Sequence, residues 1–296
     1  MDSSSYFNLA SPPRQIPALL RVQVLFGGFI NQFGWGFFGF GLIFLLGFGL
    51  FVDWTQPLFA LGQVETAPGV ILAVESTGST VNDVPVYAYT YNFRVERQEA
   101  VYQGEAYANG RQFETGWDVT VEYLADNPEI SRIHGTRHGI FPIWVLAIVL
   151  PFPLVGLGFI IAGLTRGLAG LRLLSSGRLT VGKLSGKEPT STRINNQPVY
   201  KLSFDFKGDD GFPQTAIAKT HKTFLLEDEP EERLLYDPHH PNRAVLLDNL
   251  PGSPEIDPFG QLYASNAKGA VLSLLLPGLV LVGHGLALTA IIMAKL

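Results

Sequence analysis

Residues 33–52 read FGWGFFGFGLIFLLGFGLFV, and this stretch decides the fold class because it contains no charged side chain. A helix needs about 20 predominantly apolar residues to cross the hydrocarbon core of a bilayer. The uncharged run begins earlier, at residue 22, but Gln23, Asn31 and Gln32 lie in its first third. We therefore predict a first transmembrane helix within 22–52, with the spanning part near 33–52 and an interfacial lead-in before it. Residues 1–21 form a polar N-terminal tail.

Two further uncharged runs, at 139–165 and 269–294, predict a second and a third transmembrane helix. Pro142, Pro151 and Pro153 in the second run, and Pro277 in the third, would interrupt a helix in a soluble protein. In a membrane, neighbouring helices can satisfy the backbone groups that a proline frees. Three buried helices of a soluble protein are the alternative, and it is disfavoured because one face of such a helix normally meets water and carries charge.

The distribution of lysine and arginine predicts the orientation, since these residues favour the cytoplasmic side. Residues 53–138 hold five basic residues against twelve acidic ones. We therefore predict a multi-pass protein of the cell (inner) membrane, with the N-terminus cytoplasmic, 53–138 outside and 166–268 cytoplasmic. If the first run folds as a hairpin instead, both polar segments share one side. The basic residues that flank the first and second runs on the predicted inner side are Arg14, Arg21, Arg166, Arg172, Arg178, Lys183 and Lys187.

The two polar segments resemble each other at a constant offset of 113 residues. A single offset that holds without a gap indicates one module used twice. The matching positions are Gly69 with Gly182, Asn82 with Asn195, Pro85-Val86-Tyr87 with Pro198-Val199-Tyr200, Tyr91 with Phe204, Phe93 with Phe206, Tyr123 with Tyr236, and Pro128 with Pro241.

Both segments show the period-two alternation of β-strands. In 200–206, for example, Tyr200, Leu202, Phe204 and Phe206 would line one face, with polar residues between them. The sequence therefore predicts a membrane α+β protein. We expect about three transmembrane helices and two duplicated small antiparallel β-barrel or sandwich domains, at 63–135 and 176–250, with a linker at 251–268.

Three short motifs carry a resemblance to a known family. They are Gly-Leu-Gly-Phe at 156–159, Pro-Val-Tyr at 85–87, and Tyr-Leu-Ala-Asp-Asn-Pro at 123–128 with its counterpart Tyr-Asp-Pro at 236–238. The chain resembles the bacterial membrane protein family catalogued as domain of unknown function 3592 over most of 65–135 and 140–250. The resemblance implies transmembrane helices paired with a β module. It implies no activity, cofactor or catalytic residue.

Composition and motifs indicate no catalytic, cofactor-binding or metal site. The chain has no cysteine, which excludes disulfides and thiolate metal sites, and its net charge of −5 argues against nucleic-acid binding. His239 and His240 are expected in an exposed turn, and the acidic run 227–232 on a solvated surface. His284 is the one ionisable group deep in a predicted helix, where it packs or serves transport.

Small residues in the helices indicate close helix packing, either within the chain or between chains. They are Gly27, Gly34 and Gly41 in the first run, and Gly163 and Gly167 at the end of the second.

The sequence favours a non-catalytic accessory or scaffold protein whose β modules bind another protein or the membrane surface. The expected partners are the lipid bilayer and a membrane or membrane-proximal protein, with a homo-oligomer possible and no cofactor. A small transporter or channel component that acts as an oligomer is the alternative, because proline-bearing helices can line substrate sites. An enzyme has the least support.

Overall fold

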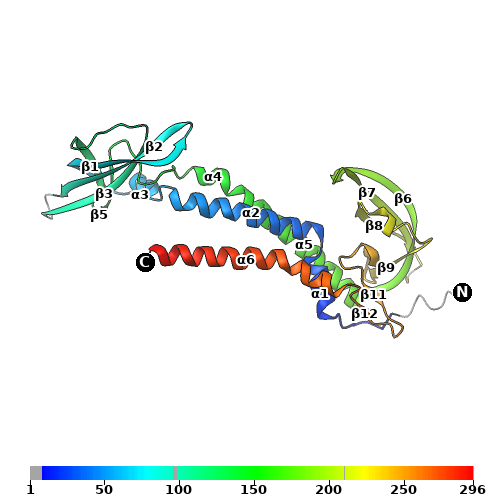
Figure 1. Ribbon diagram of the computed structural model, residues 1–296. Coiled ribbons are helices and arrows are strands. Elements are labelled where there is room, and N and C mark those ends of the chain that lie inside the picture. The colour runs from blue at the N-terminus through cyan, green and yellow to red at the C-terminus, as the bar shows by residue number, and fades with distance from the viewer. Residues whose placement is uncertain (1–8, 96–98, 210, 296) are drawn as a thin grey trace. The chain divides into compact units, whose positions relative to one another are not determined.

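The computed structural model describes residues 9–95, 99–209 and 211–295 (Figure 1). The chain divides into two compact units. One comprises Met1–Gly39 with Leu154–Leu296, and the other comprises Phe40–Pro153. Each unit contains one five-stranded antiparallel sheet together with parts of the long helices, so the protein is of mixed α+β class.

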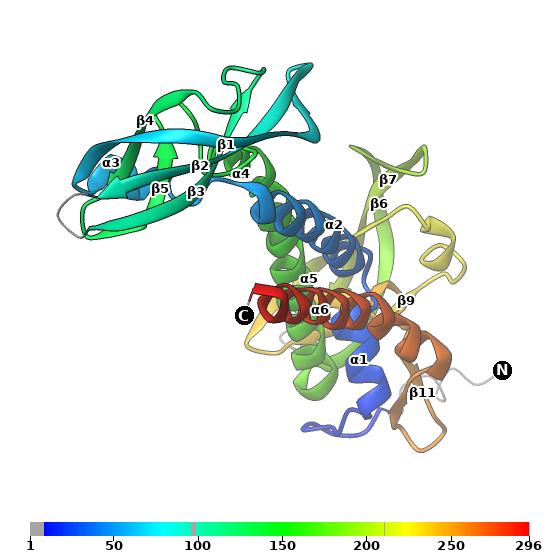
Figure 2. The same cartoon turned by 60° about the vertical axis from the view of Figure 1, so that its left-hand side comes forward.

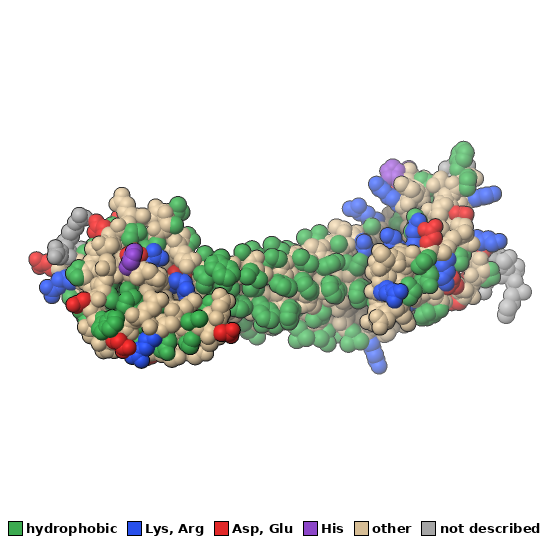
Figure 3. Space-filling view, turned by 90° about the horizontal axis from the view of Figure 1, so that it is seen from above, with side chains coloured by type: hydrophobic (Ala, Val, Ile, Leu, Met, Phe, Trp, Pro, Cys, Tyr) green, Lys and Arg blue, Asp and Glu red, His purple; other side chains and the backbone are tan. Residues whose placement is uncertain are grey.

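Three helical segments are long and apolar enough to cross a membrane: Phe29–Phe51, Val145–Ser176 and Ala267–Met293. Only 17 to 22% of the residues in their most apolar windows are buried. On the face seen in Figure 3, hydrophobic side chains predominate over the long helices, whereas charged side chains gather over the sheets. The helices are α1 (Ala18–Phe26), α2 (Phe29–Phe51), α3 (Gln56–Leu61), α4 (Val145–Val149), α5 (Pro151–Ser176) and α6 (Ala267–Lys295).

The helix bounds differ from the expected ones in informative ways. The helix expected at 139–165 begins at Val145 and continues as α5 to Ser176, because Arg166 and Arg172 end an apolar run without ending a helix. Gly177 ends it, with its backbone N–H donating to the carbonyl of Leu173.

The first run is interrupted at Gly27-Gly28, which separates α1 from α2. With nine residues α1 is too short to cross a bilayer, which needs about 20. It packs beside the start of α6 (Figures 1 and 2).

The linker expected at 251–268 contains a small hairpin of β11 (Glu255–Ile256) and β12 (Leu262–Tyr263).

The first sheet has the strand order β3-β2-β1-β4-β5. Its concave side is filled by alternate side chains of the strands, centred on Tyr89, Tyr91 and Phe93 of β2. Gly104 of β3 leaves room for the Tyr91 ring, since a Cβ there would lie 2.4 Å from the Tyr91 hydroxyl oxygen. The strands are β1 (Val64–Val81), β2 (Val84–Val95), β3 (Ala100–Asn109), β4 (Asp118–Leu124) and β5 (Asn127–Ile133).

The second sheet has the order β10-β9-β6-β7-β8, which read from the other edge is the order of the first. Leu202, Phe204 and Phe206 of β7 centre its core. A further apolar cluster joins α1, the end of α5 and β9 through residues such as Leu20, Leu174 and Leu235. The strands are β6 (Arg178–Ile194), β7 (Gln197–Lys207), β8 (Pro213–Thr220), β9 (Glu232–Asp237) and β10 (His240–Leu246).

The registers of the two sheets correspond at the same offset of 113 residues. The ladder between β1 and β2 shifts between Ile71 and Ala73 and again between Ser76 and Thr80. The ladder between β6 and β7 shifts at the corresponding places, between Leu184 and Gly186 and between Pro189 and Arg193.

The hairpin turns correspond as well. Asn82 and Asp83 have positive φ angles of 50° and 63°, and Asn195 and Asn196 have 49° and 63°. Two consecutive positive φ angles define the type I′ turn that suits the twist of a two-residue hairpin.

Neither sheet is the closed barrel that the strand pattern allowed. In the first sheet an isolated bridge joins Tyr107 of the edge strand β3 to Arg137, which follows β5. Closure needs a continuous ladder between the edge strands. Among the described residues no ladder joins β3 to β5 or β8 to β10, so both sheets stay open.

Candidate functional site

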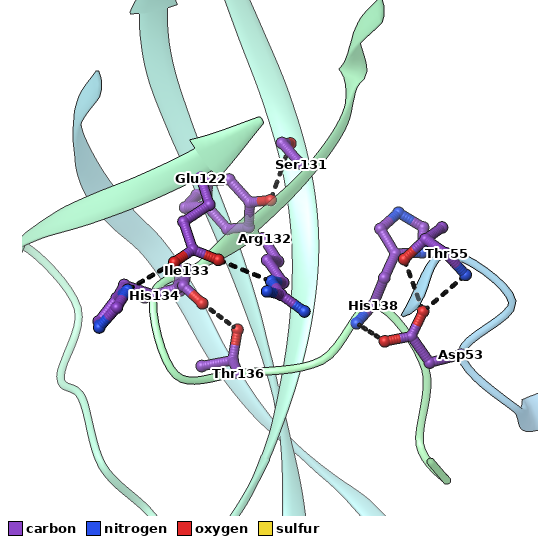
Figure 4. Close-up of polar contacts among 10 residues, drawn as sticks. Asp53, Thr55, Glu122, Ser131, Arg132, Ile133, His134, Thr136 and His138 are labelled. Carbon is purple, nitrogen blue, oxygen red and sulfur yellow. Dashed lines mark hydrogen bonds and ion pairs between the residues drawn. The ribbon is translucent and has the colours of Figure 1, made fainter. Parts of the chain in front are cut away.

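A polar cluster of the first sheet joins Glu122, Arg132 and His134 on its outer face (Figure 4). Glu122 of β4 and Arg132 of β5 are register partners, and Arg132 Nε donates to Glu122 Oε2 over 2.8 Å. His134 Nδ1 lies 2.6 Å from Glu122 Oε1. The Arg132 guanidinium also lies 4.2 Å from the centre of the Phe59 ring, which attaches α3 to the sheet.

These contacts keep Glu122 ionised at neutral pH. Burial raises the pKa of Glu122, but the hydrogen bonds from His134 and Arg132 outweigh burial and leave the pKa below its ordinary value. Hydrogen bonds to the charged form stabilise that form, which explains the direction.

A carboxylate paired with an imidazole can orient a catalytic base, but such a base needs a nucleophile within reach. Ser131 neighbours the pair in sequence and belongs to the opposite face of β5, where it is buried. Its hydroxyl lies 2.9 Å from that of Tyr91 inside the sheet. The contacts of the cluster join β4, β5 and α3.

A second cluster fixes the point where α2 ends (Figure 4). The buried carboxylate of Asp53 accepts hydrogen bonds from the backbone N–H of Thr55 at 2.9 Å, from its hydroxyl at 2.6 Å, and from the backbone N–H of His138 at 3.0 Å. The backbone N–H of Asp53 donates to the carbonyl of Phe141. The end of α2 is thus tied to the segment that leads into α4.

The two adjacent histidines lie where the sequence placed them, exposed at the turn between β9 and β10. His240 Nδ1 lies 2.5 Å from the carbonyl oxygen of His239, so its ring is engaged locally. In the described part of the chain, no group of three or more His, Cys, Asp or Glu residues is arranged to hold a metal ion.

The acidic run contains one residue that sequence reasoning missed. Glu232 is 1% exposed, and no lysine, arginine or histidine of the described residues forms an ion pair with it. Burial, together with the nearby carboxylates of Asp248, Asp228 and Glu229, raises the pKa of Glu232 to about 7, against a smaller opposing effect of the Glu229 backbone. Its place on the inner side of β9 is the only sequence signal of this burial.

His284 forms one local contact in α6. Its Nδ1 lies 2.7 Å from the carbonyl oxygen of Val280, one turn earlier. Its Nε2 is buried without a hydrogen-bond partner among the described residues. The structure gives His284 a local contact and brings no second ionisable side chain to it within the described set.

Three polar side chains of the first run contact other segments of the chain. Gln23 and Asn31 are buried, and Gln32 Nε2 donates to the carbonyls of Phe26 and Ser273 at 2.7 Å each. Gln23 Nε2 donates to the carbonyl of Asn266. Because α2 begins at Phe29, Asn31 and Gln32 belong to the helix that was expected to span from residue 33.

Four of the five small-residue positions hold helices together within the chain, as one of the two interpretations predicted. A Cβ on Gly34 would lie 2.6 Å from the backbone nitrogen of Ile160, and one on Gly41 would lie 2.5 Å from that of Pro153. Gly163 and Gly167 contact α2 and α1 in the same way. Gly27 instead lies against the carbonyl of Gln23 in its own turn.

Comparison of the chain with protein-family models, with curated proteins and with solved structures found no match. The function proposed below therefore rests on the geometry of this chain.

Proposed function

We propose that this chain is a multi-pass protein of the cell membrane in which α2, α4 with α5, and α6 cross the bilayer. The support is the outward-facing apolar surface of these helices, where side chains such as Ile43, Leu154 and Leu279 are more than half exposed. Each large apolar side chain left in water forfeits about 1.5–3 kcal/mol relative to burial. In lipid the same surface is favourable.

In this arrangement the N-terminus is cytoplasmic, 53–138 lie outside and 166–268 are cytoplasmic. The bias of arginine and lysine supports this orientation. The shortness of α1 favours a single span in the first run over a hairpin. Trp54 and Trp144 are exposed beside the outer helix ends, as in an interfacial aromatic belt.

The two sheets are copies of one module in this proposal. Shared strand order, matching register shifts and matching type I′ turns at one offset support the duplication. The resemblance to the family catalogued as domain of unknown function 3592 agrees with a membrane protein that carries such a module.

The function we assign is that of a non-catalytic accessory or scaffold protein whose β modules bind another protein. The observation that carries it is that each sheet keeps edge strands with no hydrogen-bonded ladder between them, above all β8, which lies near β10 without pairing with it. An unpaired edge offers backbone N–H and C=O groups to an added strand. On β8 the side chain of Ile217 is 55% exposed and offers a large apolar surface to a bound segment.

A single introduced cysteine tests the binding edge, because the natural chain has none. In native membranes, Ile217→Cys carrying a short crosslinker should yield one adduct of defined mass with another protein. The matched control is Leu184→Cys on the central strand β6, whose side chain is also partly exposed. An identical adduct pattern at both positions, or crosslinks to lipid alone, would contradict edge recognition.

The alternative is a small transporter or channel component that acts as an oligomer. The unpartnered Nε2 of His284 and Oδ1 of Asn31 favour it, among the described residues. The hydrogen bonds of Gln23 and Gln32 to carbonyls of other segments favour packing instead. A change in solute flux on His284→Ala in reconstituted vesicles would support the alternative.

A further inference from the structure

A basic cavity opens at the C-terminal end of α5, in the same unit as α1. Its volume is about 330 Å³. Three arginines and three apolar side chains line it, together with two serines, and the lining contains no carboxylate. The arginines are Arg14, Arg21 and Arg172, and the apolar residues are Ile16, Leu168 and Leu171.

Arg14 is fixed in place by backbone carbonyls. Its Nε donates to Ala10 at 2.5 Å, its Nη1 to Leu174 at 3.0 Å and its Nη2 to Gly177 at 2.8 Å. The bonds to Leu174 and Gly177 satisfy carbonyls at and just after the end of α5 that have no partner within the helix. Burial lowers the pKa of Arg14 from its ordinary value, and no carboxylate contributes to that shift.

Arg21 and Arg172 are exposed, and the side chain of neither forms a hydrogen bond or an ion pair with another described residue. Three guanidinium groups around one cavity repel one another while no anion lies between them. An anion with several oxygens relieves that repulsion and accepts their N–H groups, for which phosphate geometry is well suited.

The apolar and the basic residues of the cavity follow one another along α5. Leu168 and Arg172 are four residues apart and therefore share one helix face, about 6 Å apart along the axis. Leu168 is 50% exposed and lies toward the apolar body of the helix, whereas Arg172 lies toward its end. An apolar surface followed by a cluster of positive charge matches the order of acyl chain and phosphate in a phospholipid.

We propose that this cavity binds the phosphate headgroup of an anionic phospholipid, with the start of an acyl chain against Leu168. The inference rests on the proposed membrane insertion of α5 and specifies a lipid partner for it. Basic pockets at the cytoplasmic ends of transmembrane helices have the charge to hold such headgroups. A free phosphate would use the arginines but gain nothing from Leu168.

The test uses the full-length protein. Extraction of membranes with alkaline carbonate comes first, and release of the chain by that treatment would overturn the membrane proposal itself. If the chain stays in the membrane, purified protein in detergent is mixed with phosphatidylglycerol or phosphatidylcholine, and retained lipid is measured by native mass spectrometry. We expect preferential retention of phosphatidylglycerol.

The Arg21→Gln/Arg172→Gln variant should weaken phosphatidylglycerol binding at least about tenfold. It spares Arg14, whose loss would disturb the end of α5. The matched control is Arg166→Gln/Arg193→Gln, which removes the same charge at two exposed positions outside the cavity and should bind as the wild type does. Equal binding by the cavity variant and the control would overturn the proposal.

Competition with inorganic phosphate distinguishes a lipid headgroup from a soluble phosphate compound as the bound anion. At millimolar concentration, inorganic phosphate should leave the retained phosphatidylglycerol unchanged. Displacement of the lipid by inorganic phosphate would reassign the cavity to a soluble phosphate compound. Equal retention of phosphatidylcholine and phosphatidylglycerol by the wild type would also overturn the proposal, since it would show no headgroup selectivity.

Discussion

The hydroxyl oxygen of Tyr91 on β2 lies 2.9 Å from that of Ser131 on β5, although β1 and β4 separate these two strands in the sheet. The contact is possible only because the sheet curls until its second and fifth strands face each other. Burial raises the pKa of Tyr91 to about 12, against the smaller effect of the Ser131 hydrogen bond, so the phenol stays protonated. The pair is the polar centre of an otherwise apolar core.

Removing one partner of this pair should destabilise the first sheet. Tyr91→Phe leaves the buried Ser131 hydroxyl without its partner and should lower the free energy of unfolding by about 1–2 kcal/mol. The second sheet has Phe204 and Ala244 at the corresponding positions. Tyr91→Phe/Ser131→Ala should therefore be more stable than Tyr91→Phe, as measured by thermal unfolding in detergent. A double variant no more stable than the single one would contradict this explanation.

Glu232 should make the stability of the second sheet depend on pH. Its pKa is about 7 in the folded protein, against an ordinary value of 4.5. Between these values the folded state binds more protons than the unfolded chain, so the free energy of unfolding falls as pH rises. The stabilisation is complete below about pH 4.5 and is lost as pH rises through about 7.

Glu232→Gln checks this dependence. At pH 8 the variant should exceed the wild type in stability by on the order of 2–3 kcal/mol, because the neutral amide avoids a buried charge. Asp248, whose pKa burial also raises, should leave a smaller residual slope. Exposed Glu231→Gln is the control and should follow the wild type. Parallel Tm values for Glu232→Gln and wild type from pH 5 to 8 would refute the prediction.

Close packing of α2 against α5 should fail when a side chain is added at the contact. A Cβ on Gly156 would lie 2.4 Å from the backbone nitrogen of Phe38, whereas one on Gly158 meets nothing within 4 Å. Gly156→Val should therefore cost about 1–3 kcal/mol through overpacking. Gly158→Val on the same helix should change the Tm in detergent little. Equal Tm values for the two variants would show that the contact does not hold the helices.

The proposed topology can be read from single cysteines in intact cells. Glu129→Cys in the first sheet and Lys219→Cys in the second are both at exposed positions. A membrane-impermeant maleimide should label Glu129→Cys directly, and Lys219→Cys only after permeabilisation. Labelling of both from outside would establish the hairpin alternative for the first run, because that arrangement puts both sheets on one side.

Much of the architecture follows from patterns between near neighbours in the chain. The uncharged runs predict the three long helices, and the alternation around Tyr200–Phe206 predicts β7. Helix ends were less predictable, as with α5, because arginine ends an apolar run while remaining a good helix former. Local sequence pattern also could not predict whether each sheet closes into a barrel, because closure depends on pairing between edge strands that lie far apart in the chain.

The sequence by itself determined the apolar helices, the alternating strands and the offset of 113 residues at which the two polar segments match. The helices and strands depend on periodicity that acts over a few residues, and the offset is found by comparing sequence positions directly. Only the tertiary structure decided that Glu232 and Asn31 are buried, that Tyr91 faces Ser131, and that Arg14, Arg21 and Arg172 surround one cavity. Burial and clustered charge depend on contacts between residues far apart in the chain, and those contacts exist only once the helices and sheets have packed.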